Sequence, residues 1–224
     1  MVRCSSEHAA YWHGYARALP SPQEQAAAQA AAVRALDPAA AQALREQQED
    51  RERSRRQDEH LLWRGRRPEG PIADIPEARE LVRCDRPLID ALAAAPAAVL
   101  REVAHCAARW ALTEAGMADI DWIAAALTAL EAGRALPAPF DDDAQVWRRL
   151  FTDERIPATT VRSPDGGEYD WSRQHFSMPA LLSAAHPDPL RAAVASIAHA
   201  VVGVGPDGCD ALVTTVRNVL AGRG

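Results

Sequence analysis

The chain has 224 residues, 48% of them hydrophobic, and its 25 basic side chains against 31 acidic ones give a formal net charge of −6. All of the basic residues are arginine, so the chain contains no lysine. Without a lysine ε-amine the protein can neither form a Schiff base with a carbonyl substrate nor place a P-loop lysine on a nucleotide phosphate. The apolar content is sufficient for the core of one ordinary domain, with or without an appendage.

No segment approaches the roughly 18 consecutive apolar residues that a membrane-spanning helix requires. The first residues, 1–8, lack the apolar run of a signal peptide, so we expect a cytoplasmic protein with no membrane partner. Its four cysteines, Cys4, Cys84, Cys106 and Cys209, form no CxxC pair. Except for Cys4, they are expected to be buried as small hydrophobic residues, and no cofactor is expected.

The first 68 residues predict a helical extension made of three helices. Apolar spacing, helix propensity and an Asp-Pro start place these helices at about residues 6–19, 23–36 and 38–63. Residues 45–60 of the third helix are polar on every side, which indicates a projecting helix held by its own ion pairs. Residues 64–71 hold two Gly and two Pro and are expected to be a linker, after which a compact domain of residues 72–224 begins.

The compact domain is expected to be helical, with apolar periodicity at about residues 96–115, 121–133, 141–151, 190–201 and 209–220. In the third of these segments the residues expected to be buried are Val146, Trp147, Leu150 and Phe151. Residues 159–171 alternate polar and β-favouring residues around a Pro-Asp-Gly-Gly turn, which predicts a small β-hairpin. The predicted fold class is therefore mainly α: an irregular helical bundle with one small β-hairpin and a projecting N-terminal helical region.

Two short motifs match known binding signatures, but their surroundings favour structural roles. The string from Gly203 to Gly208 matches GxGxxG, yet helical periodicity precedes it and too few residues follow for a second strand. A turn between two helices is therefore predicted. Asp141, Asp142 and Asp143 form an acidic run with no second metal motif, and the predicted role of this run is to cap the N-terminus of a helix.

Glu102 and His105 match an ExxH pattern, which places a carboxylate and an imidazole on the same face of a helix, as metal-binding bundles require. No second ExxH exists in the chain. The two residues are candidate metal ligands, and a surface ion pair is the favoured interpretation.

Residues 168–176 gather carboxylates, an Arg, a His and three aromatic residues in a stretch expected to be irregular, and loops often carry function. His175 is the candidate acid–base residue, with Asp170 as its orienting carboxylate. A small-molecule-binding or hydrolytic enzyme that uses residues Tyr169–Phe176 is one hypothesis, and it predicts a pocket of several hundred Å³ beside His175. The favoured alternative is that these aromatic residues only dock the hairpin on the helices.

The favoured function is binding of another protein without catalysis, as in a regulator or a toxin-neutralising partner. Two features of the N-terminal part support it, the aromatic helix and the charged helix, and residues 113–224 carry 9 Arg against 15 acidic residues, which attracts a basic partner. The N-terminal helices also offer a surface for a homo-oligomer. The residues expected to contact the partner are Tyr11, Trp12, Tyr15, Arg53, Arg56, Trp63 and Arg66.

A nucleic-acid-binding regulator is the third hypothesis. Residues 45–67 hold eight Arg, which suits contacts to phosphate. The same stretch holds six acidic residues and no interleaved aromatic platform, so nucleic acid is not the favoured partner.

Overall fold

A computed structural model of the chain describes residues 21–35, 38–162 and 170–222. The chain divides into two compact units, unit 1 (residues 1–58) and unit 2 (residues 59–224). Among the described residues, no helix is both long enough and apolar enough to cross a membrane. The helix predicted at residues 6–19 lies outside the described part.

Unit 1 contains α2 (Pro22–Ala35) and most of α3 (Pro38–Leu62), close to the predicted bounds. α2 begins with a reciprocal cap, in which Ser21 N donates to the Glu24 carboxylate (2.7 Å) and Glu24 N donates to Ser21 Oγ (3.2 Å). Residues 45–58 of α3 are all exposed. Ion pairs join Arg53 to Asp50 and Arg56 to Glu52 on this helix, so the prediction of an ion-paired polar helix is confirmed.

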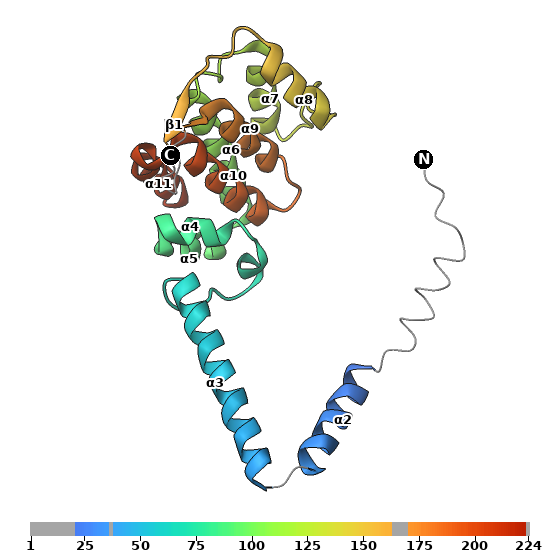
Figure 1. The fold of residues 1–224 in the computed structure, drawn as a ribbon. Helices are drawn as coiled ribbons and strands as arrows, with labels where there is room; N and C mark the ends of the chain where they lie inside the picture. The colour runs from blue at the N-terminus through green and yellow to red at the C-terminus, as the bar shows by residue number, and fades with distance from the viewer. Residues whose placement is uncertain (1–20, 36–37, 163–169, 223–224) are drawn as a thin grey trace, which may run out of the picture. The chain divides into compact units, whose positions relative to one another are not determined.

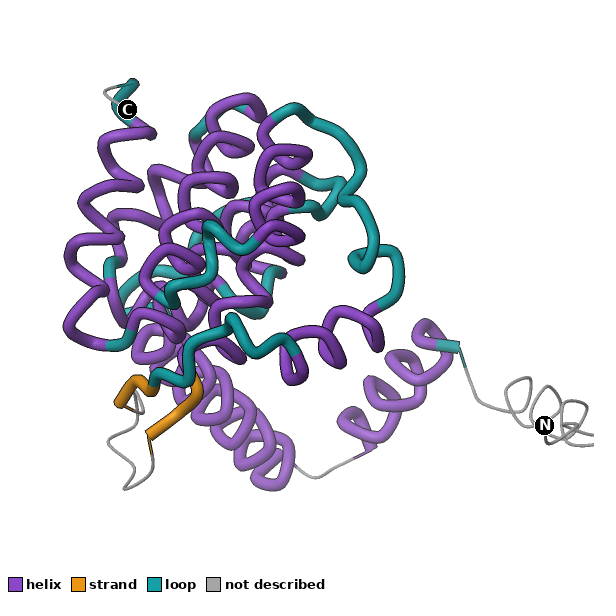
Figure 2. Tube along the Cα trace, turned by 90° about the horizontal axis from the view of Figure 1, so that it is seen from above, coloured by secondary structure: helices purple, strands orange, loops and turns teal. Residues whose placement is uncertain are grey.

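Unit 2 is a bundle of helices with one short antiparallel hairpin, so the prediction of a mainly α fold is confirmed (Figures 1 and 2). In the hairpin, Val161 lies opposite Trp171. The elements in chain order are a 3₁₀ turn η1 (Pro71–Asp74), α4 (Ala78–Cys84), α5 (Arg86–Ala94), α6 (Ala97–Glu114), α7 (Asp121–Glu131), α8 (Asp143–Thr152), β1 (Thr160–Arg162), β2 (Asp170–Ser172), α9 (Arg173–Ala184), α10 (Pro189–Val204) and α11 (Pro206–Leu220).

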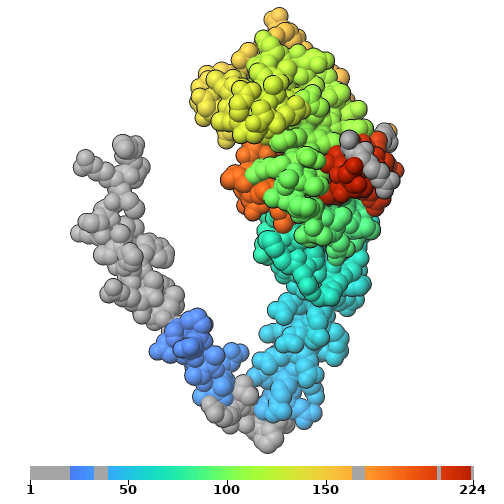
Figure 3. Space-filling model, turned by 180° about the vertical axis from the view of Figure 1, so that it is seen from behind, coloured from blue at the N-terminus to red at the C-terminus, as the bar shows by residue number. Residues whose placement is uncertain are grey.

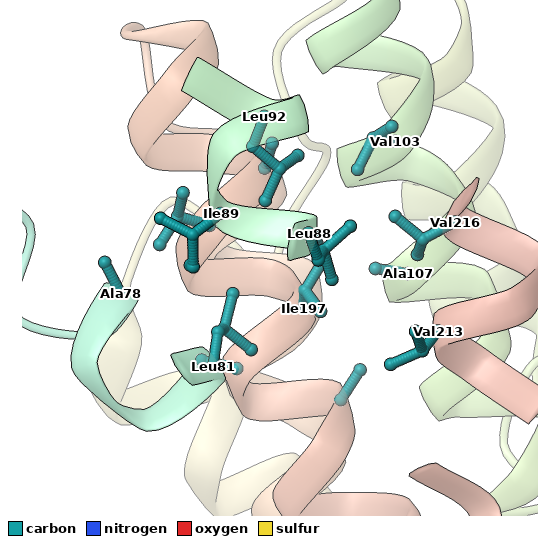
Figure 4. Close-up of a cluster of buried hydrophobic side chains, with 14 of the residues drawn as sticks. Ala78, Leu81, Leu88, Ile89, Leu92, Val103, Ala107, Ile197, Val213 and Val216 are labelled. Atoms are coloured by element: carbon teal, nitrogen blue, oxygen red, sulfur yellow. The ribbon is translucent and has the colours of Figure 1, made fainter. Parts of the chain in front are cut away.

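One hydrophobic cluster joins α4, α5, α6, α10 and α11. Leu88 and Leu92 of α5 point toward Val103 of α6, Ile197 of α10 and the valines of α11 (Figure 4). Trp63 is 1% exposed and belongs to the same cluster. Unit 2 begins at Glu59 rather than near residue 72, and Trp63, which precedes the predicted linker of residues 64–71, already belongs to its core.

A second cluster lies around α6, α7, α8 and α9. Its packing depends on small side chains: Ala104 and Ala108 of α6 and Ala184 of α9 are fully buried. Between α9 and α10, Ser196 donates a hydrogen bond to the carbonyl of Ala180 (3.0 Å). Small side chains let helix axes approach closely, which explains how an Ala-rich chain builds this core.

Two local predictions have clear outcomes. The segment from Gly203 to Gly208 contains a junction between two helices, as predicted: α10 ends at Val204, α11 begins at Pro206, and Gly205 between them has a φ of +74°. The prediction of an irregular stretch at residues 168–176 is wrong in its described part. Residues 170–172 form β2, and α9 begins immediately afterwards at Arg173.

Candidate functional site

The site is built on α8, whose start is fixed by a cap. Asp142 Oδ1 accepts a hydrogen bond from Ala144 N (2.9 Å) and Asp142 Oδ2 accepts one from Gln145 Nε2 (3.1 Å). These hydrogen bonds, with that from Gln145 the larger cause, hold the pKa of Asp142 below its usual range. The capping role predicted for the acidic run is thus confirmed for Asp142.

The helical periodicity of α8 then separates an inner face from an outer one. Val146 and Leu150 are buried, and each is followed by an aromatic residue turned about 100° away from it. Trp147 is consequently half-buried, and Phe151 is 68% exposed. The prediction that Phe151 is buried is wrong, since the apolar stripe of α8 is wider than the face that the core can cover. In Figure 3 the segment around α8, in yellow, forms the surface at one end of unit 2.

The start of α9 supplies the facing side chains. Ser172 Oγ caps this helix by accepting a hydrogen bond from His175 N (3.3 Å). Gln174 is 4% exposed, and its Nε2 donates to Thr159 Oγ1 (2.6 Å) and to the carbonyl of Ala115 (3.4 Å). Because Gln174 is held inward, its neighbour His175 turns outward and is exposed.

Five rings from α8, β2 and α9 form one connected surface cluster, which we name the aromatic patch: Trp147, Phe151, Trp171, His175 and Phe176. The ring centroid of His175 lies 4.9 Å from that of Trp147 and 5.9 Å from that of Phe151. Phe176 meets the ring of His175 at 5.2 Å, nearly edge-on, and stacks on Trp171 at 4.5 Å. These separations are within the range of favourable aromatic pairs.

A pocket of about 320 Å³ adjoins the aromatic patch and is partly lined by Phe151 and His175. The other apolar residues of its lining are Leu150, Ile156, Pro157 and Ala158. Two acidic residues also line it. Asp153 already has partners, because it binds Arg155 (2.7 Å) and accepts a hydrogen bond from Trp122 Nε1 (3.1 Å). Glu154, in contrast, is exposed and has no ion pair within the described part of the chain.

The two candidate catalytic residues, Asp170 and His175, have different partners in the structure. Asp170 Oδ2 accepts a hydrogen bond from Thr160 Oγ1 (3.3 Å) across the hairpin. No hydrogen bond among the described residues joins Asp170 to His175, which instead lies among aromatic rings. The pocket expected beside His175 is present, but the orienting carboxylate that acid–base catalysis requires is not supplied by Asp170.

The candidate metal ligands lie on the solvent side of α6. His105 is half-buried at a second pocket of about 760 Å³, and Glu102 is exposed. Burial lowers the pKa of His105, against the opposing effect of the Glu131 carboxylate. Glu131 itself pairs with Arg109 (2.9 Å). Within the described residues, no group of three His, Cys, Asp or Glu side chains could hold a metal ion.

The residues predicted to bind a partner have different positions. Arg53 and Arg56 are exposed on α3 with their ion pairs, and Arg66 is exposed and pairs with Glu69. Trp63, in contrast, is buried in the core, so it presents no side chain to a partner. Tyr11, Trp12 and Tyr15 lie outside the described residues, and a homo-oligomer through the N-terminal helices stays a prediction.

Comparison with known proteins finds no match for this chain. No protein-family model, no curated protein and no solved structure matches it.

Proposed function

We propose that this protein acts by binding another protein, and that the aromatic patch with its adjoining pocket receives the partner. The observation that carries the proposal is the exposure of Phe151, 68%, within a connected cluster of aromatic rings. Single exposed apolar side chains are common on protein surfaces, but clusters of them mark interaction sites. Aromatic residues are also enriched among the few residues that dominate binding energies.

The surroundings of the patch indicate the chemistry of the partner. Five of the eleven residues that line the adjoining pocket are apolar, and its volume suits one aliphatic or aromatic side chain of the partner. Glu154 at the same pocket is an exposed carboxylate with no ion pair among the described residues, and the C-terminal half of the chain carries the whole excess of negative charge. A partner with an apolar anchor next to a basic residue fits both features, as in a regulator or a toxin neutraliser.

Photo-crosslinking followed by reconstitution tests the proposal. A photoreactive residue at position 151 identifies the partner in the native cell, and the affinity of the purified pair is then measured. Phe151→Ala is expected to weaken binding at least about tenfold, or about 1.4 kcal/mol, because it removes the exposed centre of the patch. Leu61→Ala is the matched control, since Leu61 is equally exposed at 68% but lies outside the patch, and it should change affinity less than about twofold.

A second variant tests the predicted charge of the partner. Glu154→Gln should slow association at low ionic strength and have little effect at high salt, because charges at the rim of an interface act mainly on the encounter rate. Both variants should melt at the temperature of the unmodified protein, since neither side chain is buried. Unchanged affinity in Phe151→Ala, with the fold intact, would reject the aromatic patch as the docking surface.

A further inference from the structure

Two cysteines from distant parts of the chain meet at the surface of unit 2. Cys84 is the last residue of α4 and is exposed, and Cys209 lies in the first turn of α11 and is half-buried. Their side chains are in hydrogen-bond contact, although α5 to α10 lie between them in the sequence. The expectation that these cysteines are buried is therefore wrong, and Cys106 on α6 is also only half-buried.

Neighbouring contacts hold the same two elements together independently of the thiols. Asp85, which follows Cys84, pairs with Arg217 of α11 (2.6 Å). Arg64 Nη1 donates to the carbonyl of Arg83 (3.1 Å), which places a guanidinium beside Cys84. In Figure 1, α11 lies next to α4 and α5, as these contacts require.

We propose that Cys84 and Cys209 form a reversible disulfide by exchange with low-molecular-weight disulfides, and that this bond locks the start of α11 to the end of α4. The two thiols are already hydrogen-bond neighbours, and a disulfide requires their sulfur atoms to close to about 2.05 Å. The disulfide closes a loop of the chain that runs from Cys84 to Cys209 and contains α5 to α10. Such a loop restricts the unfolded chain and stabilises the folded one.

The exchange balances without any other reactant. The Cys84 thiolate attacks one sulfur of the external disulfide, forming a mixed disulfide and releasing the first external thiolate. The sulfur of Cys209, after losing its proton, attacks the sulfur of Cys84 and releases the second external thiolate. Two protein thiols are oxidised to one disulfide, one external disulfide is reduced to two thiols, and the two protons of the protein thiols end on those products.

The groups around Cys84 and Cys209 determine which of the two thiols attacks the external disulfide first. The hydrogen bond with Cys209 lowers the pKa of the Cys84 thiol, and the Arg64 guanidinium lowers it further, against burial and the carboxylates of Glu80 and Asp85. The same hydrogen bond raises the pKa of Cys209. Cys84 is therefore the more ionised of the two thiols and attacks first.

Tryptic mapping of the full native chain after incubation with oxidised glutathione tests the proposal. Because the chain has no Lys and trypsin does not cleave before Pro87, the four cysteines fall on the separate peptides 4–17, 84–101, 102–109 and 192–217. After alkylation and digestion without reductant, we expect peptides 84–101 and 192–217 as one linked species. The oxidised protein should melt about 5 °C or more above the reduced protein.

Variants and conditions separate this outcome from non-specific oxidation. Cys84→Ser should abolish both the linked species and the rise in melting temperature, Cys106→Ser should leave both intact, and dithiothreitol should reverse both. A stable glutathione adduct on peptide 84–101 without the linked species would overturn the proposal. So would a linked species that forms no faster in the native chain than in guanidinium chloride, because the folded contact would then contribute nothing.

Discussion

Gly203 of α10 lies at a close approach between α9 and α10. A Cβ atom placed there would collide with Ser177 Oγ and would stand only 3.1 Å from Ser177 Cα and 3.2 Å from Ser177 N. Backbone atoms of a helix cannot turn away as a flexible side chain can, so the two helices would have to separate. Gly203→Ala is therefore expected to lower the free energy of unfolding by roughly 1–3 kcal/mol, measured by urea denaturation.

A second variant tests the cause of that loss. Ser177 Oγ is buried without a hydrogen-bond partner in the described part of the chain, so Ser177→Ala should be neutral or slightly stabilising. In the Ser177→Ala background the cost of Gly203→Ala should become smaller, because one of the colliding atoms is gone. An identical cost in both backgrounds would show that the contact with this hydroxyl is not responsible.

Arg155 gives the stability of unit 2 a dependence on pH. Its guanidinium bonds to Asp153 and Asp121 and is the largest cause that holds the pKa of each carboxyl below the ordinary value of about 3.9. A carboxyl with a depressed folded pKa stabilises the protein above its unfolded pKa, and this contribution disappears as the pH falls through the folded value. Arg155→Ala should therefore lower stability at pH 7 but make progressively less difference below about pH 4.

Thermal melts between pH 7 and pH 2 check this expectation. Arg148→Ala is the control, because Arg148 is an exposed neighbour on α8 with no ion pair in the described part of the chain. Added salt should reduce the effect of Arg155→Ala, since the Arg155 side chain is half exposed. An effect that stays constant from pH 7 to pH 2 would contradict the assigned ion pairs.

At the scale of elements, α10 is the helix against which most of unit 2 packs, and its start is fixed by Asp188. Asp188 Oδ1 accepts a hydrogen bond from Arg191 N (2.9 Å), and Pro189 occupies the first helical position. Asp188→Ala should cost about 1 kcal/mol of unfolding free energy in denaturant titrations. Asp188→Asn keeps the accepting oxygen and should cost only a few tenths, whereas equal losses in both variants would show that the charge, rather than the cap, matters.

The elements that the sequence predicts correctly are those with a long apolar period or clear end signals. α6, α10 and α11 are of this kind, and so are the two strands of the hairpin, β1 and β2. α4 and α5 have seven and nine residues, too few for a periodic pattern to stand out. In α9, Pro179 lies inside the helix and argues locally against one. Tertiary packing decides these segments.

The aromatic patch shows the same division between local and tertiary information. The sequence singles out His175 and its aromatic neighbours, and in the structure His175 lines a pocket. The sequence does not reveal that Trp147 and Phe151 join His175 and its neighbours, because Trp147 and Phe151 belong to α8 and look like core residues in the apolar stripe of that helix. The distinction depends on how much of α8 the core covers, which only the assembled fold determines.

For the whole molecule, the buried hydrophobic clusters lie in unit 2, while residues 45–58 of α3 in unit 1 are exposed throughout. The exposed ion pairs of that helix contribute only a few tenths of a kcal/mol each. Most of the stability of the described chain therefore comes from residues 59–224. Where this unit begins is decided by Trp63, whose ring is buried just before the Gly- and Pro-rich segment 64–71.

Two shortened chains test that boundary. Residues 59–224 keep Trp63 and both hydrophobic clusters, so they should unfold in one cooperative transition with a melting temperature close to that of the full chain. Residues 72–224 lose the indole, and truncation of a buried Trp costs about 3–5 kcal/mol, so this chain should be markedly less stable. Trp63→Ala in the full chain should reproduce most of the difference. Equal stability of the two shortened chains, measured in urea, would place the start of the folded unit at residue 72 instead.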